Sequence, residues 1–137
     1  MPVTWIISYP TRLVVALAKG EVSLQDIQAY LDAVVVAEAL PYRKLFDTTA
    51  ASIALSDIEL MTLGARIRAY IALGPIGPLA IVATSDESYW QARMFAALAE
   101  ADRPVKIFRE LPTARDWLEG HPPGRTTHLP PLASNDT

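Results

Sequence analysis

The sequence predicts an α/β fold: a mixed sheet of four to five strands, flanked by about four helices. Short apolar runs typical of strands alternate with segments of helical periodicity over most of the 137 residues. Two helical segments open with a capping box, Ser23 with Asp26 and Ser56 with Glu59. Strands separated by helices need parallel crossovers, so we expect the later strands to be parallel and the N-terminal strand to be an antiparallel edge.

The first two segments predict an antiparallel hairpin. Residues 3–9 alternate between apolar and polar side chains, although Ile6 breaks the pattern, and residues 13–18 form an apolar run too short for a helix. Lys19-Gly20 closes this run. We therefore expect two paired strands at the start of the sheet.

The remaining elements follow from helical stripes, stop signals and short apolar runs. The run 79–83 is apolar throughout, as in a strand covered on both faces. The second helix is expected to turn Leu60, Leu63, Ile67 and Ile71 inward. The expected elements are a helix between Ser23 and Pro41, a strand over 44–47, a helix between Ser56 and Gly74, a strand over 79–83, a helix over 86–101, a strand over 105–108 and a helix over 113–119.

Composition divides the chain into one folded domain, residues 1–119, and a flexible Pro-rich tail, residues 120–137. The net charge of −3 gives no positive field for nucleic acid. The sequence shows no secretory signal and no apolar run long enough to span a membrane, so a cytoplasmic location is expected. The absence of cysteine excludes disulfides, thiolate nucleophiles and cysteine zinc sites.

The hairpin closed by Lys19-Gly20, the strand-terminal Asp47 and the late segment VKIFRELPTARDWL together resemble bacterial SpoIIAA-like proteins. That group is related to the STAS domain of sulfate transporters and anti-sigma-factor antagonists, and shares some shape with CRAL-TRIO lipid-binding domains. The resemblance covers roughly residues 3–119. It implies the fold, and it favours a regulatory or protein-interaction module of STAS-like type.

In signalling STAS proteins, a strand ending in Asp leads to a Ser at the start of the next helix, and a partner kinase phosphorylates that Ser. Placed on this pattern by Asp47, the chain has Asp57 about where the acceptor would lie, with Ser56 beside it. Either Ser56 is an acceptor in a shifted register, or Asp57 makes the helix start permanently acidic. In the third reading, which we favour, Ser56 is only a helix N-cap.

The sequence offers no catalytic or metal-binding constellation. Asp47, Thr84 and Lys106 resemble parts of a phosphoacceptor site, but no carboxylate ends the first strand to help hold Mg²⁺. The two histidines, His121 and His128, both lie in the tail, so no base is available for a hydrolase triad and no rigid element presets a metal site. We expect no enzyme activity, no metal and no cofactor.

Charge at the helix starts also disfavours an anion there. Asp57 begins the second helix, and Asp86 and Glu87 begin the third, so these carboxylates already supply the negative charge that the helix dipoles favour. Trp90 and Arg93 share a helical neighbourhood that would suit a protein interface, although packing of Trp90 against the domain is the more common outcome.

Two functions from different classes remain. The first is a non-enzymatic module that docks a protein partner through a surface around Asp47, Ser56, Asp57 and Thr84. This module is also expected to associate with itself. The alternative is a carrier of a small apolar molecule or lipid. A cavity of roughly 300 Å³ or more between helices and sheet would favour the carrier. Its expected lining includes Met61, Met94 and Phe95.

Overall fold

The computed structural model describes residues 2–53, 55–98 and 103–123, and shows a mixed five-stranded sheet with strands in the order β1-β2-β3-β4-β5. Strand β1 is antiparallel to β2, and the other neighbouring pairs are parallel, which confirms the predicted α/β fold. The elements are β1 (Val3–Ser8), β2 (Leu13–Val22), α1 (Leu24–Val36), β3 (Arg43–Ile53), α2 (Asp57–Ala69), a 3₁₀ turn (Tyr70–Leu73), β4 (Leu79–Val82), α3 (Asp86–Leu98), β5 (Val105–Phe108) and α4 (Leu111–Glu119).

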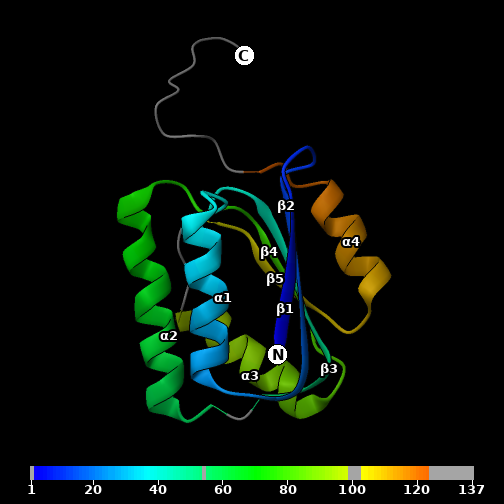
Figure 1. Cartoon of the computed structure of the whole chain (residues 1–137). Coiled ribbons are helices and arrows are strands. Elements are labelled where there is room, and N and C mark those ends of the chain that lie inside the picture. The colour runs from blue at the N-terminus through cyan, green and yellow to red at the C-terminus, as the bar shows by residue number, and fades with distance from the viewer. Residues whose placement is uncertain (1, 54, 99–102, 124–137) are drawn as a thin grey trace.

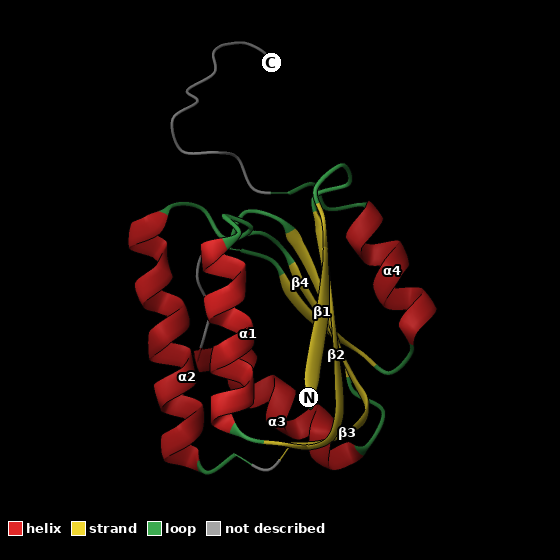
Figure 2. Ribbon diagram, in the orientation of Figure 1, coloured by secondary structure: helices red, strands yellow, loops and turns green. Residues whose placement is uncertain are grey.

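The helices cover both faces of the sheet unequally. Helices α1, α2 and α3 lie on one face, and α4 alone lies on the other (Figures 1 and 2). The four residues of β4 are all buried, as predicted for a central strand covered on both faces. The side with three helices therefore holds the larger part of the core.

The predicted hairpin is confirmed, with β1 at the edge of the sheet. Val3 pairs with Ala18, and Ser8 pairs with Leu13. Val3 is buried, whereas the side chain of Ile6 points to the other face and is 74% exposed, which explains why Ile6 breaks the apolar alternation. Strand β2 continues beyond the predicted end to Val22, through Gly20 at a φ of 71°.

Strand β3 does not end at Asp47 as predicted, but runs on to Ile53. Its pairing with β4 ends where Asp47 meets Val82, while its pairing with β2 continues. At this point one residue of β2, Ala18, faces two of β3, Thr48 and Thr49, which is a β-bulge. Two hydrogen bonds fix the bulge: Thr49 N–H donates to Asp47 Oδ1 at 2.9 Å, and the Thr48 hydroxyl donates to the Val82 carbonyl at 2.6 Å.

Both predicted capping boxes are present. The Ser23 and Ser56 hydroxyl oxygens accept from the backbone N–H groups of Asp26 and Glu59, at 3.2 and 3.1 Å. Ile71 was expected to face inward but is 46% exposed, because α2 ends at Ala69 and a 3₁₀ turn carries Ile71 off its buried face.

Some predicted boundaries move or cannot be placed. Helix α4 begins at Leu111, earlier than the predicted 113. The predicted end of the third helix, 99–101, and most of the predicted tail, 124–137, lie outside the described residues.

Candidate ligand site

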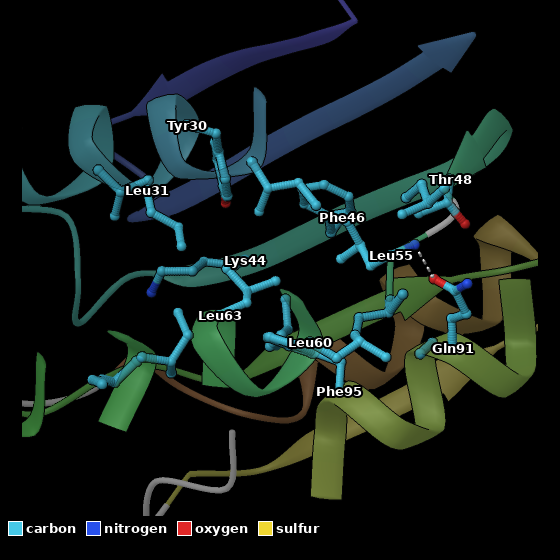
Figure 3. A pocket seen from close by; sticks show the side chains of 18 of the residues that line it. Tyr30, Leu31, Lys44, Phe46, Thr48, Leu55, Leu60, Leu63, Gln91 and Phe95 are labelled. Carbon is cyan, nitrogen blue, oxygen red and sulfur yellow. Dashed lines mark hydrogen bonds between the residues drawn. The ribbon is translucent and has the colours of Figure 1, made fainter. Parts of the chain in front are cut away.

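A cavity of about 100 Å³ lies between the sheet and helices α1, α2 and α3 (Figure 3). Its lining is mostly apolar, but it includes several polar side chains. Among the residues that line it are Tyr30, Leu31, Lys44, Phe46, Thr48, Leu55, Leu60, Leu63, Tyr70, Ser88, Gln91, Ala92, Phe95 and Arg103. The cavity thus combines apolar walls with a few polar groups, which is typical of small-molecule sites.

Lys44 enters the cavity because of the strand period. In β3, side chains alternate between the two faces, so Lys44, Phe46 and Thr48 share the face toward the cavity. The Lys44 side chain is almost fully buried, with 4% of the residue exposed. Its Nζ donates to the carbonyl oxygens of Leu40 and of Tyr42, the latter at 2.7 Å. The Lys44 Nζ is therefore held at the amino end of β3 by two backbone carbonyl groups.

Arg103 brings a second buried cation to the same end of the sheet. It lies just before β5, whose first residue Val105 pairs with Leu79, and Leu79 in turn pairs with Lys44. Arg103 is 9% exposed, and its Nη1 donates to the Gly77 carbonyl at 3.3 Å. Its Nε is buried and has no hydrogen-bond partner among the residues that the structure describes.

Tyr30 contributes a phenol from α1. Its ring packs between Trp5 and Phe46, with centroid distances of 5.8 and 5.5 Å. The hydroxyl points into the space between sheet and helices (Figure 3) and is buried, with no hydrogen-bond partner in the described part of the chain. We refer to Tyr30, Lys44 and Arg103 as the polar cluster.

Electrostatic interactions connect the polar cluster. Burial lowers the pKa of Lys44 well below its ordinary value, and the positive charge of Arg103 lowers it further. Burial also lowers the pKa of Arg103 to about 10, against a smaller raising effect of Tyr30. The pKa of Tyr30 is raised, mainly by burial.

The cavity lining contains no carboxylate among the described residues. Two basic groups and a phenol thus share a low-dielectric space without a negative partner from that part of the chain. Such an arrangement disfavours the charged forms of the basic groups and favours binding of an anion. On the right of Figure 3, the Leu55 N–H donates a hydrogen bond to Gln91 Oε1 at 3.4 Å.

The structure does not bring the predicted docking residues onto one surface. Asp47 is buried and shares the face of β3 with Leu45, which packs against α4. Ser56 and Asp57 are exposed at the start of α2, on the opposite side of the sheet (Figure 1). Thr84 is exposed beyond the end of β4, and its carbonyl accepts from Arg109.

The Ser56 hydroxyl oxygen takes part in the capping box, so its described contacts are those of an N-cap.

The predicted interface residues on α3 are both exposed, Trp90 to 62%. The same helix turns Gln91 and Phe95 toward the cavity. Of the three residues expected to line a carrier cavity, Phe95 does so, whereas Met61 and Met94 are exposed and the expectation for them was wrong. Met61 lies one position beyond Leu60, and Met94 one before Phe95, so the helical turn carries both out of the cavity.

Sequence reasoning missed the polar cluster. For Lys44 a signal existed, because Lys44 and Phe46 are two apart in a predicted strand and must share a face. Tyr30 lies three residues after Ile27 and one before Leu31, within the predicted core stripe of its helix. For Arg103 no local pattern distinguishes a buried loop arginine from an exposed one.

The fold places the chain in the class of SpoIIAA-like α/β modules. A crystal structure of an uncharacterized protein from the DUF3478 family, with a SpoIIAA-like fold and from Shewanella loihica PV-4, matches it with a TM-score of 0.58. Sequence identity is 18%, and the match covers 85% of this chain and 93% of that chain. The predicted likeness to SpoIIAA-like proteins is thereby confirmed for the fold. No protein-family model matches the sequence, and no curated protein matches it.

Within the ranges that the structure describes, no group of three or more His, Asp or Glu side chains could hold a metal ion. None of the helices described there is long and apolar enough to cross a membrane.

Proposed function

We propose that this protein is a non-enzymatic binding module for a small molecule with an apolar body. The observation that supports this most is the cavity, whose lining joins apolar walls to the polar cluster, where two buried polar atoms find no partner among the described residues. Buried polar atoms in folded proteins normally have partners, so unpaired ones facing a cavity favour a ligand that would complete them. The cavity also lies within the side of the sheet that carries three helices.

The volume limits the ligand to a small one. A cavity of about 100 Å³ is below the roughly 300 Å³ expected for a lipid or drug-sized ligand. It approaches the roughly 150 Å³ of an engineered apolar cavity in another protein that binds benzene. The proposal is therefore narrower than the carrier that the sequence left open as an alternative: a benzene ring or a short alkyl chain is small enough to propose, and a long lipid is not.

The side chains around the cavity support binding over catalysis. Ser88 and Thr48 supply hydroxyls, but no histidine or carboxylate of the described lining stands beside them as a base. His121 lies elsewhere: it follows α4 on the other face of the sheet, stacks on Trp117 at 4.2 Å, and its Nδ1 lies 2.8 Å from the Trp117 carbonyl.

Substitution of leucine for alanine at two matched positions tests the proposed function. Ala92 is buried and lines the cavity from α3, whereas Ala97 is exposed on the same helix. Toluene, as a neutral probe, should shift the NMR signals of the Gln91 side chain in the wild type and in Ala97→Leu. Ala92→Leu should abolish the shift because it fills the cavity. An equal toluene response in Ala92→Leu would overturn the proposal, as would a wild type that binds neither toluene nor any small apolar acid or amide.

A second candidate function is docking of a protein partner, or of a second copy, on the outer side of α3. Supporting it is the high exposure of Trp90, a residue that is enriched at the centres of interfaces. Light scattering and partner capture with wild type, Trp90→Ser and Arg93→Ser test it. Capture of the same partner, or the same self-association, by all three proteins would exclude this surface.

A further inference from the structure

The polar cluster has hydrogen-bond donors that the described residues do not satisfy. Within residues 2–53, 55–98 and 103–123, the Tyr30 hydroxyl and Arg103 Nε have no hydrogen-bond partner. A protonated Lys44 has three N–H donors, and the contacts described for it use two carbonyl oxygens. All of these groups are donors that an acceptor-rich ligand group could satisfy together.

The charges of the cluster favour an acceptor that is negative. Arg103 stays protonated at neutral pH, because its pKa of about 10 lies well above that range. The positive charge of Arg103 repels a protonated Lys44 and so lowers the pKa of Lys44. An anion between them would replace this repulsion by two attractions in a medium of low dielectric, where each is stronger than in water.

From these contacts we propose that the ligand is a small monocarboxylic acid, whose carboxylate is bound by Tyr30, Lys44 and Arg103 and whose apolar part fills the cavity. This inference rests on the proposed function. A carboxylate offers two oxygens with about four lone-pair positions, which suits a lysine, an arginine Nε and a phenol. A phosphate would bring a larger charge and a third oxygen, for which the cluster offers no further basic group among the described residues.

The walls beyond the cluster define the apolar part of the ligand. Leu31, Leu60, Leu63 and Phe95 come from three helices and surround the same space as Phe46 from the sheet (Figure 3). The volume of about 100 Å³ admits a short alkyl chain or one aromatic ring. Affinity should therefore rise with chain length and then fall once the chain exceeds the cavity.

Pairs of acids and their primary amides separate the two proposals, because each amide keeps the shape of its acid and loses the charge. Straight-chain pairs from acetate to decanoate, together with benzoate and benzamide, are titrated into the full chain by calorimetry. We expect an acid of intermediate length to bind about tenfold or more tightly than its amide. If an acid and its amide bind equally, the carboxylate inference fails and the proposed function stands. If none of them binds, and toluene does not bind either, the proposed function fails.

Substitutions locate the carboxylate. Lys44→Met and Arg103→Met should each weaken binding of the acid about tenfold or more while leaving the amide nearly unchanged. Tyr30→Phe should weaken the acid by a smaller factor. The matched controls are Lys19→Met, Arg93→Met and Tyr9→Phe, three substitutions of exposed residues. These variants should bind both compounds as the wild type does.

Three results would overturn the assignment. In the first, folded Lys44→Met and Arg103→Met proteins bind the acid as tightly as the wild type. In the second, the controls weaken binding as much as the cluster variants do, which would indicate a general effect of surface charge. In the third, inorganic phosphate displaces the acid at equal concentration, which would indicate a site for phosphate. Thermal unfolding of each variant establishes that it is folded before binding is measured.

Discussion

Lys44 and Gly77 donate hydrogen bonds to the same carbonyl oxygen, that of Leu40. The Gly77 N–H does so at 2.8 Å, and the Gly77 carbonyl accepts from Arg103 in turn. The loop before β3 therefore contacts Lys44 through its backbone, and the loop before β4 contacts Arg103. The hydrogen bond from the Gly77 N–H to the Leu40 carbonyl joins the two loops, so it links the positions of the two basic groups.

Gly77→Ala should destabilise the protein and disturb the cluster. An added Cβ would lie 2.2 Å from the Tyr42 carbonyl oxygen and 2.3 Å from that of Pro41, so the backbone must move. We expect a loss of about 2 to 3 kcal/mol in the free energy of unfolding, measured with urea. Gly120→Ala is the control, because its nearest contact would be an ordinary 3.6 Å. Equal stability of the two variants would contradict the close packing at Gly77.

Lys44→Met should stabilise the protein at neutral pH, and the gain should depend on pH. The pKa of Lys44 is lower in the folded state than its ordinary 10.5, so the unfolded chain binds the proton first as the pH falls. Wild-type stability is therefore lost as the pH falls from about 10.5 toward the folded pKa, and Met removes this loss. The Tyr42 carbonyl loses a partner, so we expect a net gain of about 1 kcal/mol.

Urea unfolding above and below pH 10.5 measures this effect. The difference between Lys44→Met and the wild type should be smaller on the alkaline side. Lys19→Met, at an exposed lysine of β2, should show no such change with pH. A constant difference at every pH would show that Lys44 is not desolvated in the folded protein.

Binding of the monocarboxylate should be accompanied by proton uptake. A bound anion raises the lowered pKa of Lys44, while Arg103 is already protonated and the raised pKa of Tyr30 keeps the phenol neutral. Tyr70, a second tyrosine that lines the cavity, provides a control position for this prediction. Affinity should therefore fall as the pH rises from the pKa of Lys44 in the free protein to its pKa in the complex.

Calorimetry in buffers of different ionisation enthalpy measures the proton uptake directly. Lys44→Met should abolish it, and Tyr70→Phe should leave it unchanged. Uptake that persists in Lys44→Met would assign the proton to another group.

Ser56→Ala should lower stability without changing ligand binding. The hydroxyl oxygen of Ser56 accepts from the Glu59 N–H at 3.1 Å, and an N-cap of this kind contributes about 1 kcal/mol. Ser56→Asp keeps an acceptor at the cap and should retain most of that stability, while Ser52→Ala at an exposed position of β3 should be neutral. Thermal unfolding of the three variants tests the assignment. A stability of Ser56→Ala equal to wild type would remove the structural role.

The order and direction of the strands could be predicted because each depends on local patterns: capped helices, a tight hairpin and short apolar runs. The length of β3 could not, because residues 48–53 include Thr48, Thr49 and Ser52, and their strand conformation depends on pairing with β2. The polar cluster was missed for a related reason. Lys44 and Arg103 are distant in sequence, and the register of the parallel strands brings them to one end of the sheet. Tyr30 joins them only through the packing of α1 on the sheet.

Helix α3 forms a wall of the cavity through Gln91 and Phe95, and on its other side it presents Trp90 to the surroundings. A ligand larger than the empty cavity must displace one of the elements that enclose the cavity, and α3 is one of them. Because α3 would move as a rigid body, any such displacement also moves the Trp90 indole on its outer side. The outer surface of the molecule would then differ between the empty and the occupied cavity, although the ligand itself contacts no neighbouring protein.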